Sequence, residues 1–477
     1  MNFRLLAFVT LALLMGSPKA HGFALNGPPD GAYQAAALNY DALEAPQMIG
    51  EEYRWNIPIL TYGFDSSFIN YFGTNGIRAI ESAFRQLNDL PAISLVTDQV
   101  LTNTFPLNSM GNNPAAQALF ITDIKSRMLT FLVQYMGLSD AERFTWTLRN
   151  RWVDGAPSTN YVVIQRNYDP ITRMPTDTVN GQKLGYRIAD GPPADARESD
   201  PSAGGGGGFG LFGIQGRSVS SVRTLNVGGS FSSLTYDDMG GLRYLYATNN
   251  FNVENLLPTV AVTSTSASAA TGTSWYPYGV TNILTVVGSG AVNTAVRGGI
   301  DKVSFVRVDF DSLIGIGFAG VTNTWTDRYL QTVGTTAAIL SQTLARSIVR
   351  PDIVLTARDI PFAGANVPPL NNVISGNFIN HDGINGLTGQ NGPGVLTVPG
   401  GQLRVDFTTQ LPYYIDGPGQ AGPPPPGNNF GNGAIRGSGG VWGWFDDTTI
   451  HKIFPDFLNL QFSDLEQMVI DARTVIE

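Results

Sequence analysis

The chain has 477 residues, no cysteine and a formal net charge of −9. The missing thiols exclude a disulfide framework, a cysteine nucleophile and thiolate metal ligands. Because the chain is acidic and has no basic cluster, phosphate backbones repel it, and we expect no nucleic acid partner. The low charged fraction of 14% and the 55 glycines favour a loop-rich, β-rich extracellular protein.

Residues 1–22 have the pattern of a secretory signal peptide. A basic residue precedes the apolar run Leu5 to Met15, and a short polar segment with small residues follows, ending at Gly22. The run is about half the roughly 20 residues that a membrane-spanning helix needs, which favours export over an N-terminal anchor. We expect cleavage just before Phe23, no transmembrane segment after it, and a mature protein in the periplasm, at the cell surface or outside the cell.

Length and the change of composition along the chain predict two domains after the signal peptide. We expect an α+β domain over residues 23–250, with a Gly-rich loop at 190–216. A β-rich, sandwich-like domain should occupy residues 251–477, with long Gly/Pro loops and a C-terminal helix.

The first third of the mature chain predicts strands and helices. The segments "IPILTYGF" (57–64) and "NYVVIQRNY" (160–168) have the composition of strands. Between them, "NGIRAIESAFRQLND" places apolar residues three and four apart, which predicts a helix that ends before Pro91.

Two more helices are predicted after the first one. The first should begin at Pro114, because proline suits the first helical position, and should run without a break to Gly137. The second should begin at "SDAERFTWTLR", where Ser139 and Glu142 have the spacing of a capping box.

The predicted loop at 190–216 contains a formal G-x-G-x-x-G pattern at Gly205, Gly207 and Gly210. In a dinucleotide-binding domain such glycines follow a strand and open a helix, so that backbone amides approach a pyrophosphate. Neither a strand nor a helix is predicted at these places here. We therefore interpret the pattern as a chance match within a glycine run.

The segment "SSLTYDDMGGLRYLY" allows two interpretations of its acidic pair, Asp237 and Asp238. Thr235 and Asp238 have capping-box spacing, which predicts the start of a helix. A catalytic or metal-binding dyad is the alternative, but neighbouring residues of a helix point about 100° apart. The cap is the favoured interpretation, and the core-facing residues of the helix would be Leu242, Leu245 and Tyr246.

Two stretches, Tyr53 to Asp89 and Ser230 to Tyr246, resemble the opening strand and helix and the last helix of matrixin-like metzincin metalloproteases. The resemblance implies an α+β fold, but the H-E-x-x-H-x-x-G-x-x-H zinc motif of that family is absent. The chain has only His21, His381 and His451, and the first leaves with the signal peptide. A tris-histidine site cannot be formed, so we expect a zinc-less relative, a pseudoenzyme, with no metal or other cofactor.

A broader resemblance covers most of the chain. The stretches "FDSSFINYFGTNG", "TVNG", "LTYDDMGGLRYLYATNN" and "PDIVLTARD" are similar to an uncharacterised family of large secreted bacterial proteins. That resemblance implies secretion and no particular chemistry.

After residue 250 the composition favours strands. The segments "TVAVTSTSAS", "NILTVVG", "KVSFVRVDFDSLIG" and "PDIVLTARDI" alternate apolar with polar residues or carry β-branched runs. Long loops should occupy 361–369 and 417–440, and "SDLEQMVIDARTVIE" should form the closing helix, with Ser463 and Glu466 in capping-box spacing.

Few other residues suggest chemistry. The loop that begins at Asn380 offers oxygen atoms for calcium, although a polar turn is the favoured interpretation. Trp442 and Trp444 would suit sugar stacking or packing in a core. His381 and His451 belong to no recognisable catalytic group.

We therefore expect a secreted extracellular or cell-envelope protein with a structural or interaction role, more likely not an enzyme, and with a protein or polysaccharide partner. The alternatives are an extracellular hydrolase, either a degenerate metzincin-like protease or a carboxylate-pair glycosidase, and a carbohydrate-binding protein. No catalytic, cofactor-binding or metal-binding residue is assigned.

Overall fold

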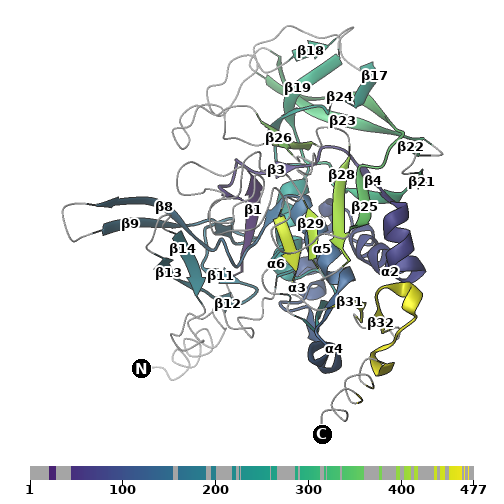
Figure 1. The fold of residues 1–477 in the computed structure, drawn as a ribbon. Coiled ribbons are helices and arrows are strands. Elements are labelled where there is room, and N and C mark those ends of the chain that lie inside the picture. The colour runs from purple at the N-terminus through teal and green to yellow at the C-terminus, as the bar shows by residue number, and fades with distance from the viewer. Residues whose placement is uncertain are drawn as a thin grey trace, which may run out of the picture.

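The computed structural model is a mixed α/β protein with several sheets (Figure 1). This confirms the predicted α+β class in its coarse form. The described residues are 21–27, 45–153, 159–189, 195–199, 218–221, 225, 227–257, 259–265, 285–287, 291–311, 316–317, 320–333, 336–358, 375–378, 394–397, 402–409, 413–416, 434–437, 441–445, 451–464, 467 and 471.

A six-stranded sheet lies at the centre of the fold. Its first four strands run parallel to one another, the fifth is antiparallel to the fourth, and the sixth is antiparallel to the fifth. In spatial order the strands are β20 (Ser304–Arg307), β4 (Ile59–Phe64), β25 (Ile353–Arg358), β28 (Leu403–Thr408), β29 (Tyr413–Asp416) and β30 (Ala434–Gly437).

The strand predictions that belong to this sheet are confirmed. The segment "IPILTYGF" contains β4, and "PDIVLTARDI" contains β25. Strands inside a parallel sheet are buried on both faces, which explains why these two are buried over nearly their whole length. The predicted loop at 417–440 is wrong in part, because it includes β30.

The central sheet crosses the boundary predicted at residue 250. Strand β4 comes from the first half of the chain and lies between β20 and β25, which come from the second half. Residues from both halves also form one hydrophobic core. The division at residue 250 therefore does not separate two sheets or two cores.

Helix α2 (Ser66–Asn88) packs on the central sheet. Its end before Pro91 is confirmed, but it begins earlier than predicted, because the Asp65 side chain accepts a hydrogen bond from the Ser67 amide and caps it. Gly73 has a φ of 57°, which interrupts the helical backbone inside this span. The sheet-facing side is rich in aromatic residues that are fully buried: Phe68, Phe72 and Phe84.

The long helix predicted from Pro114 to Gly137 is wrong. The segment forms α4 (Pro114–Ala118), strand β6 (Ile121–Asp123) and α5 (Ile124–Tyr135). Phe120 has a φ of 55°, which a right-handed helix does not tolerate. The Asp123 carboxylate accepts a hydrogen bond from the Ser126 amide and so caps the start of α5. The predicted end holds, because Gly137 has a φ of 107°.

The helix predicted at Ser139 is also wrong. Strand β7 (Leu138–Ser139) pairs with β1 (Phe23–Gly27), and residues 141–144 form a turn before strand β8 (Trp146–Val153). The capping-box spacing is present, but pairing with β1 takes the backbone of Ser139 into a sheet. Strand β1 also pairs with β2 (Ala45–Gln47) and β10 (Asn167–Tyr168), so it is an inner strand.

A second large sheet lies above the central one in Figure 1. Its main feature is the long antiparallel hairpin of β23 and β24. The segments "TVAVTSTSAS" and "NILTVVG" contain strands of this sheet, as predicted. The strands are β16 (Asn252–Asn255), β17 (Val260–Thr265), β18 (Thr285–Val287), β19 (Ala291–Arg297), β23 (Val321–Val333) and β24 (Thr336–Ile348).

The remaining elements are short. The small sheets contain β3 (Tyr53–Arg54), β5 (Met110–Asn112), β6, β11 (Thr178–Val179), β12 (Gln182–Lys183), β15 (Gly229–Phe231), β21 (Phe310–Asp311), β22 (Ile316–Gly317), β26 (Ser375–Phe378), β27 (Gly394–Thr397), β31 (Val441–Trp444) and β32 (Lys452–Ile453). The helices not yet mentioned are η3 (Ile93–Leu95), α3 (Asp98–Thr104), α6 (Tyr236–Tyr246) and η5 (Asp456–Leu458). Residues 462–464, 467 and 471 are helical, in agreement with the predicted closing helix.

Among the described residues, no helix has the length and apolar character needed to cross a membrane.

Candidate functional site

The acidic pair lies at the start of α6, where the predicted capping box is confirmed. The Thr235 hydroxyl accepts a hydrogen bond from the Asp238 amide, and the Asp238 carboxylate accepts one from the Thr235 amide at 3.0 Å. The predicted core residues of this helix, Leu242, Leu245 and Tyr246, are buried. A cap of this kind stabilises a helix by about 1 kcal/mol.

Asp238 also binds a second segment of the chain. Its carboxylate accepts hydrogen bonds from the Ser218 hydroxyl at 2.6 Å and from the backbone amides of Val219 at 2.9 Å and Ser220 at 3.0 Å. A fully buried carboxylate needs such donors, because desolvation is costly without them. Asp238 is therefore a structural residue that fixes residues 218–220 to α6.

Asp237 points to a different set of groups. The backbone amide of Asn180 donates a hydrogen bond to Asp237 Oδ2, and Asn180 Oδ1 accepts one from the Asp237 amide at 3.1 Å. Asn180 and Gly181 form the two-residue turn between β11 and β12, both with positive φ. The tip of this hairpin thus rests on the start of α6.

The Asp237 carboxylate is fully buried and incompletely bonded. Its Oδ1 atom accepts no hydrogen bond of regular geometry from a described residue, although the Gly22 backbone amide faces the carboxylate. His21 lies on the same side, with Nδ1 at 3.9 Å from Oδ1 and its ring tilted by 39° against that of Tyr236. Burial raises the pKa of Asp237 well above its ordinary value.

The two carboxylates therefore use separate donors and do not converge on one ligand position. Asp238 is occupied by Thr235 and residues 218–220, whereas Asp237 faces Asn180 and the segment before β1. In the part of the chain that the structure describes, no group of three or more His, Asp or Glu side chains could hold a metal ion. Of these two carboxylates, Asp237 is the one with an oxygen that accepts no regular hydrogen bond from a described residue.

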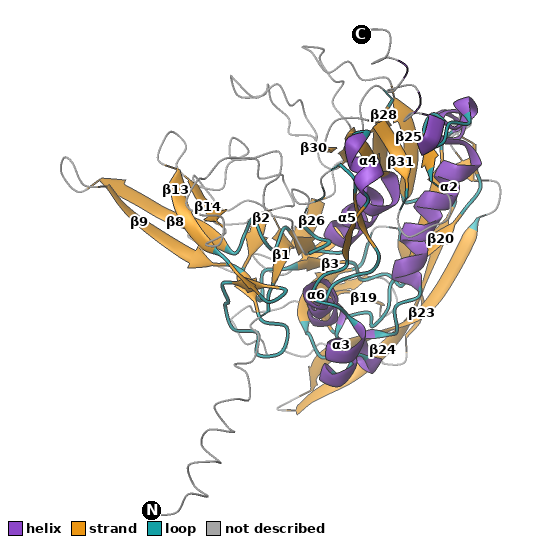
Figure 2. Cartoon of the chain, turned by 90° about the horizontal axis from the view of Figure 1, so that it is seen from below, coloured by secondary structure: helices purple, strands orange, loops and turns teal. Residues whose placement is uncertain are grey.

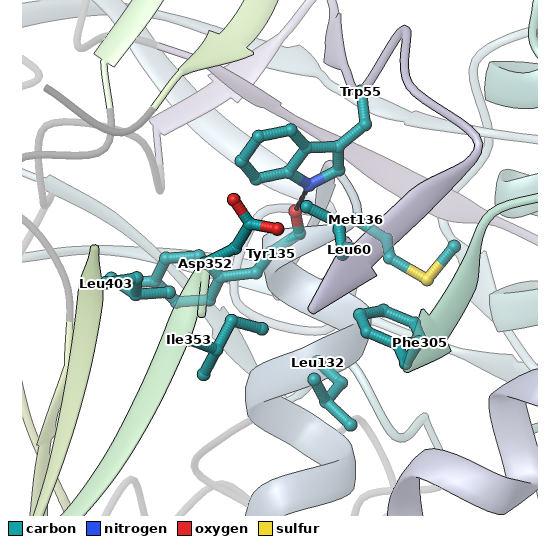
Figure 3. A pocket seen from close by; sticks show the side chains of 9 residues that line it. All are labelled: Trp55, Leu60, Leu132, Tyr135, Met136, Phe305, Asp352, Ile353 and Leu403. Atoms are coloured by element: carbon teal, nitrogen blue, oxygen red, sulfur yellow. Dashed lines mark hydrogen bonds between the residues drawn. The ribbon is translucent and has the colours of Figure 1, made fainter. Parts of the chain in front are cut away.

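A small cavity lies between α5 and the central sheet (Figure 3). Its volume is about 10 Å³, room for roughly one water molecule and far less than a small-molecule site needs. The only charged side chain in its wall, Asp352, is bound by Arg346 and by the Thr61 amide at 2.8 Å. The Trp55 indole donates to the Tyr135 carbonyl at 2.7 Å. This cavity is part of the core packing.

A pair of β-hairpins projects from the body on the side of β1 (Figures 1 and 2). We call it the β-arm: β8 with β9 (Thr159–Gln165), and β13 (Gly185–Ala189) with β14 (Asp195–Ser199). Strand β14 lies against β8, and the Trp146 ring is 4.9 Å from that of Tyr186. The predicted strand at 160–168 is confirmed by β9 and β10, whereas the predicted loop at 190–216 is wrong where it contains β14.

The β-arm exposes large apolar side chains. Trp152 is 44% exposed, Tyr186 is 45% exposed and Val162 is 38% exposed. Among its described side chains, one apolar residue is buried, Leu148, with Tyr161, Val163 and Ile188 packed against it. Each hairpin is a two-stranded sheet, and among the described strands none pairs with the outer edge of β9. Such an edge can accept another strand.

The other candidate residues from the sequence are either packed against other side chains or lie outside the described residues. Trp442 and Trp444 are buried in the core, and the Trp442 indole donates to the Thr408 carbonyl at 2.9 Å, so sugar stacking on these two is wrong. His451 stacks on Phe462 with ring centres 5.0 Å apart. Gly205, Gly207, Gly210, His381 and the loop at Asn380 lie outside the described residues.

Sequence reasoning missed Asn180, which joins the β11–β12 hairpin to the acidic pair. The Asn-Gly dipeptide between two strand-forming stretches is a strong hairpin signal and could have revealed the turn. The partner of its tip could not be found in this way, because Asp237 is 57 residues away along the chain.

Comparison with family models, with curated proteins and with solved structures finds no match to this chain. Its resemblance to metzincin proteases and to secreted bacterial proteins therefore stays a prediction, and any function has to be argued from the geometry.

Proposed function

We propose that the protein is an exported binding protein that uses the β-arm to contact another protein in the cell envelope or outside the cell. The observation that carries this proposal is the set of exposed apolar side chains on an arm that buries little of its own. Large apolar side chains that are exposed on a projecting element suit contact with a partner.

The small core of the β-arm supports the same proposal. An isolated two-stranded hairpin is marginally stable in water, and three or more strands with an apolar face are needed for independent stability. A partner that covers Trp152 and Tyr186, or that adds a strand to β9, would supply the missing burial. Aromatic side chains are also the residues that contribute most to binding at protein interfaces.

Two other candidates among the described residues give no support to a competing site. The two tryptophans that could have bound sugar are in the core, and the cavity below Trp55 holds no ligand-sized space. The exposed aromatic residues of the β-arm therefore remain the candidate contact surface that we propose.

Site-specific photo-crosslinking in the native host tests this function. A photo-reactive phenylalanine analogue replaces Trp152 or Tyr186, and we expect a discrete adduct of higher mass from each position. Matched controls carry the analogue at Phe120 and Met174, which are 60% and 64% exposed and lie outside the β-arm. We expect no adduct from these two positions.

Equal adducts from arm and control positions, or none from the arm, would contradict the proposal. A screen of the purified protein against peptides and glycans covers the alternative. Turnover that a single carboxylate substitution abolishes would establish a hydrolase instead.

A further inference from the structure

Strand β1 begins at Phe23, the residue that the signal-peptide pattern predicts as the first of the mature chain. Phe23 is 1% exposed and pairs with Tyr168 of β10. Its ring lies 5.7 Å from that of Tyr244 on α6. The mature N-terminus would therefore lie inside the fold, whereas chain ends are usually at the surface.

The residue before it is tightly enclosed. A Cβ atom added at Gly22 would lie 2.0 Å from Asn167 Nδ2 and 2.6 Å from Thr176 Cγ2, so only glycine fits there. The Gly22 amide faces the Asp237 carboxylate. The chain thus passes the only incompletely bonded oxygen of the acidic pair immediately before β1 begins.

Cleavage changes the charge at this place. A signal peptidase hydrolyses the Gly22–Phe23 peptide bond with one water molecule. The water oxygen joins the Gly22 carbonyl carbon, which leaves with the departing peptide as a carboxylate. Both water protons go to the Phe23 nitrogen, which becomes an ammonium group. The new cation lies one residue, roughly 3.5 Å, from the amide nitrogen that faced Asp237.

Removal of residues 21 and 22 would also take the Gly22 amide and His21 away from a fully buried carboxylate. A buried carboxylate without a partner is strongly unfavourable, and an ion pair with further hydrogen bonds relieves it. The Asn180 amide already supplies such a hydrogen bond.

We propose that cleavage before Phe23 creates a buried ion pair between the Phe23 α-ammonium group and the Asp237 carboxylate, which fixes the mature N-terminus against α6. The proposal takes from the proposed function only that the protein is exported, and from the sequence pattern the cleavage position. The ion pair would give Asp237 a role of its own, because the capping box of α6 uses Asp238 and not Asp237.

The reactivity of the N-terminal amine tests the ion pair. The full mature chain is released from a fusion partner so that it begins at Phe23, and its acylation at near-neutral pH is followed by mass spectrometry. We expect acylation of the Phe23 amine to be at least about tenfold faster in Asp237→Asn than in the unchanged protein, because a paired, buried ammonium is protected. Equal rates would overturn the proposal.

Asp238→Asn is the matched control. It removes the neighbouring charge and weakens the cap, but it should leave the amine protected. If Asp237→Asn does not fold, the unchanged protein still decides the question through an ¹⁵N-labelled Phe23 amine. We expect its pKa above the ordinary range of about 7.7–8.0, since Asp237, Asp238 and Asp169 face this region. A pKa within or below that range would contradict the ion pair.

The two proposals can fail separately. Sequencing of the N-terminus of exported protein tests the cleavage position, whereas the fusion sets the start at Phe23 whatever the native processing is. A different native terminus together with a protected Phe23 amine would refute the processing step and leave the geometry intact.

Discussion

The central sheet and the β-arm bury their side chains to very different degrees. Strands β25 and β28 place Leu355, Val405 and Phe407 in a core with no exposure, and Phe72 of α2 packs against Phe407. Among the described side chains of the β-arm, Leu148 is the one fully buried apolar residue, although β8 and β9 are equally rich in β-branched and aromatic residues. Strand-forming composition therefore does not decide whether a strand belongs to a core. The difference depends on what packs against it.

The largest expected effect comes from the core. Phe72→Ala should lower the free energy of unfolding by about 4 kcal/mol, because it leaves a cavity among aromatic rings. The Phe72 ring lies 4.6 Å from that of Phe68 and 5.1 Å from that of Phe454. Urea unfolding measures the change. Ile69→Ala, at an exposed position of α2, is the control and should cost about 0.5 kcal/mol or less.

A loss below about 1 kcal/mol for Phe72→Ala would mean that the body is as loosely packed as the β-arm. The comparison between the two regions would then have no basis.

The next effect concerns the connection between the central body and the upper sheet. Arg54 and Glu254 form a fully buried ion pair at 2.6 Å, and Arg54 also donates to the Leu245 and Asn250 carbonyls. Arg54→Met leaves these acceptors without their donor. It should lower the free energy of unfolding by about 3 kcal/mol, measured by urea unfolding.

Arg243→Met is the matched control for this pair. Arg243 binds Asp98, which is 63% exposed, so its loss should cost less than about 1 kcal/mol. Adding Glu254→Leu to Arg54→Met should restore part of the stability, because it removes the uncompensated carboxylate. A double variant less stable than Arg54→Met would contradict this account.

Local patterns predicted the elements whose neighbours in the chain fix them. The Thr235–Asp238 box starts α6 as expected, and β4 and β25 lie within the predicted strands. The same box spacing at Ser139 failed, because β1 pairs with that residue from more than 100 positions away. Spacing reports on a helix start only where no strand competes for the backbone.

The parts of the fold that the sequence did not predict depend on pairing between distant segments. The sheet order that inserts β4 between β20 and β25 joins segments separated by about 240 residues or more, and no local pattern encodes it. The role of Asp237 could not be predicted either. Its neighbour Asp238 explains the helix cap, so only the burial of Asp237 beside Gly22 and Asn180 sets it apart.

A smaller effect should appear in the dependence of stability on pH. In a chain that keeps residues 21 and 22, burial raises the pKa of Asp237 above that of the unfolded chain. The folded state then keeps a proton that the unfolded state has lost. This contribution to stability is present at low pH and is lost as the pH rises through the folded-state pKa.

Urea unfolding from about pH 4 to pH 8 tests this sign, and one carboxyl changes the free energy by at most about 1.4 kcal/mol per pH unit. His21, Asp169 and Asp238 face the same carboxylate, so the contribution of Asp237 is taken as the difference from Asp237→Asn. We expect the difference to shrink in the chain that begins at Phe23. A difference of the opposite sign would contradict the burial argument.

The smallest expected effect on stability lies in the β-arm. Trp152→Ser should change the free energy of unfolding by no more than about 0.5 kcal/mol, because 44% of the side chain is already in water. Leu148→Ala, on the same strand but 1% exposed, should cost about 2–3 kcal/mol and speed hydrogen exchange in β8 and β9. If Trp152→Ser is instead as costly as Leu148→Ala, Trp152 packs within the protein. Its exposure would then no longer support a partner, and the β-arm would be a peripheral part of the body's own core.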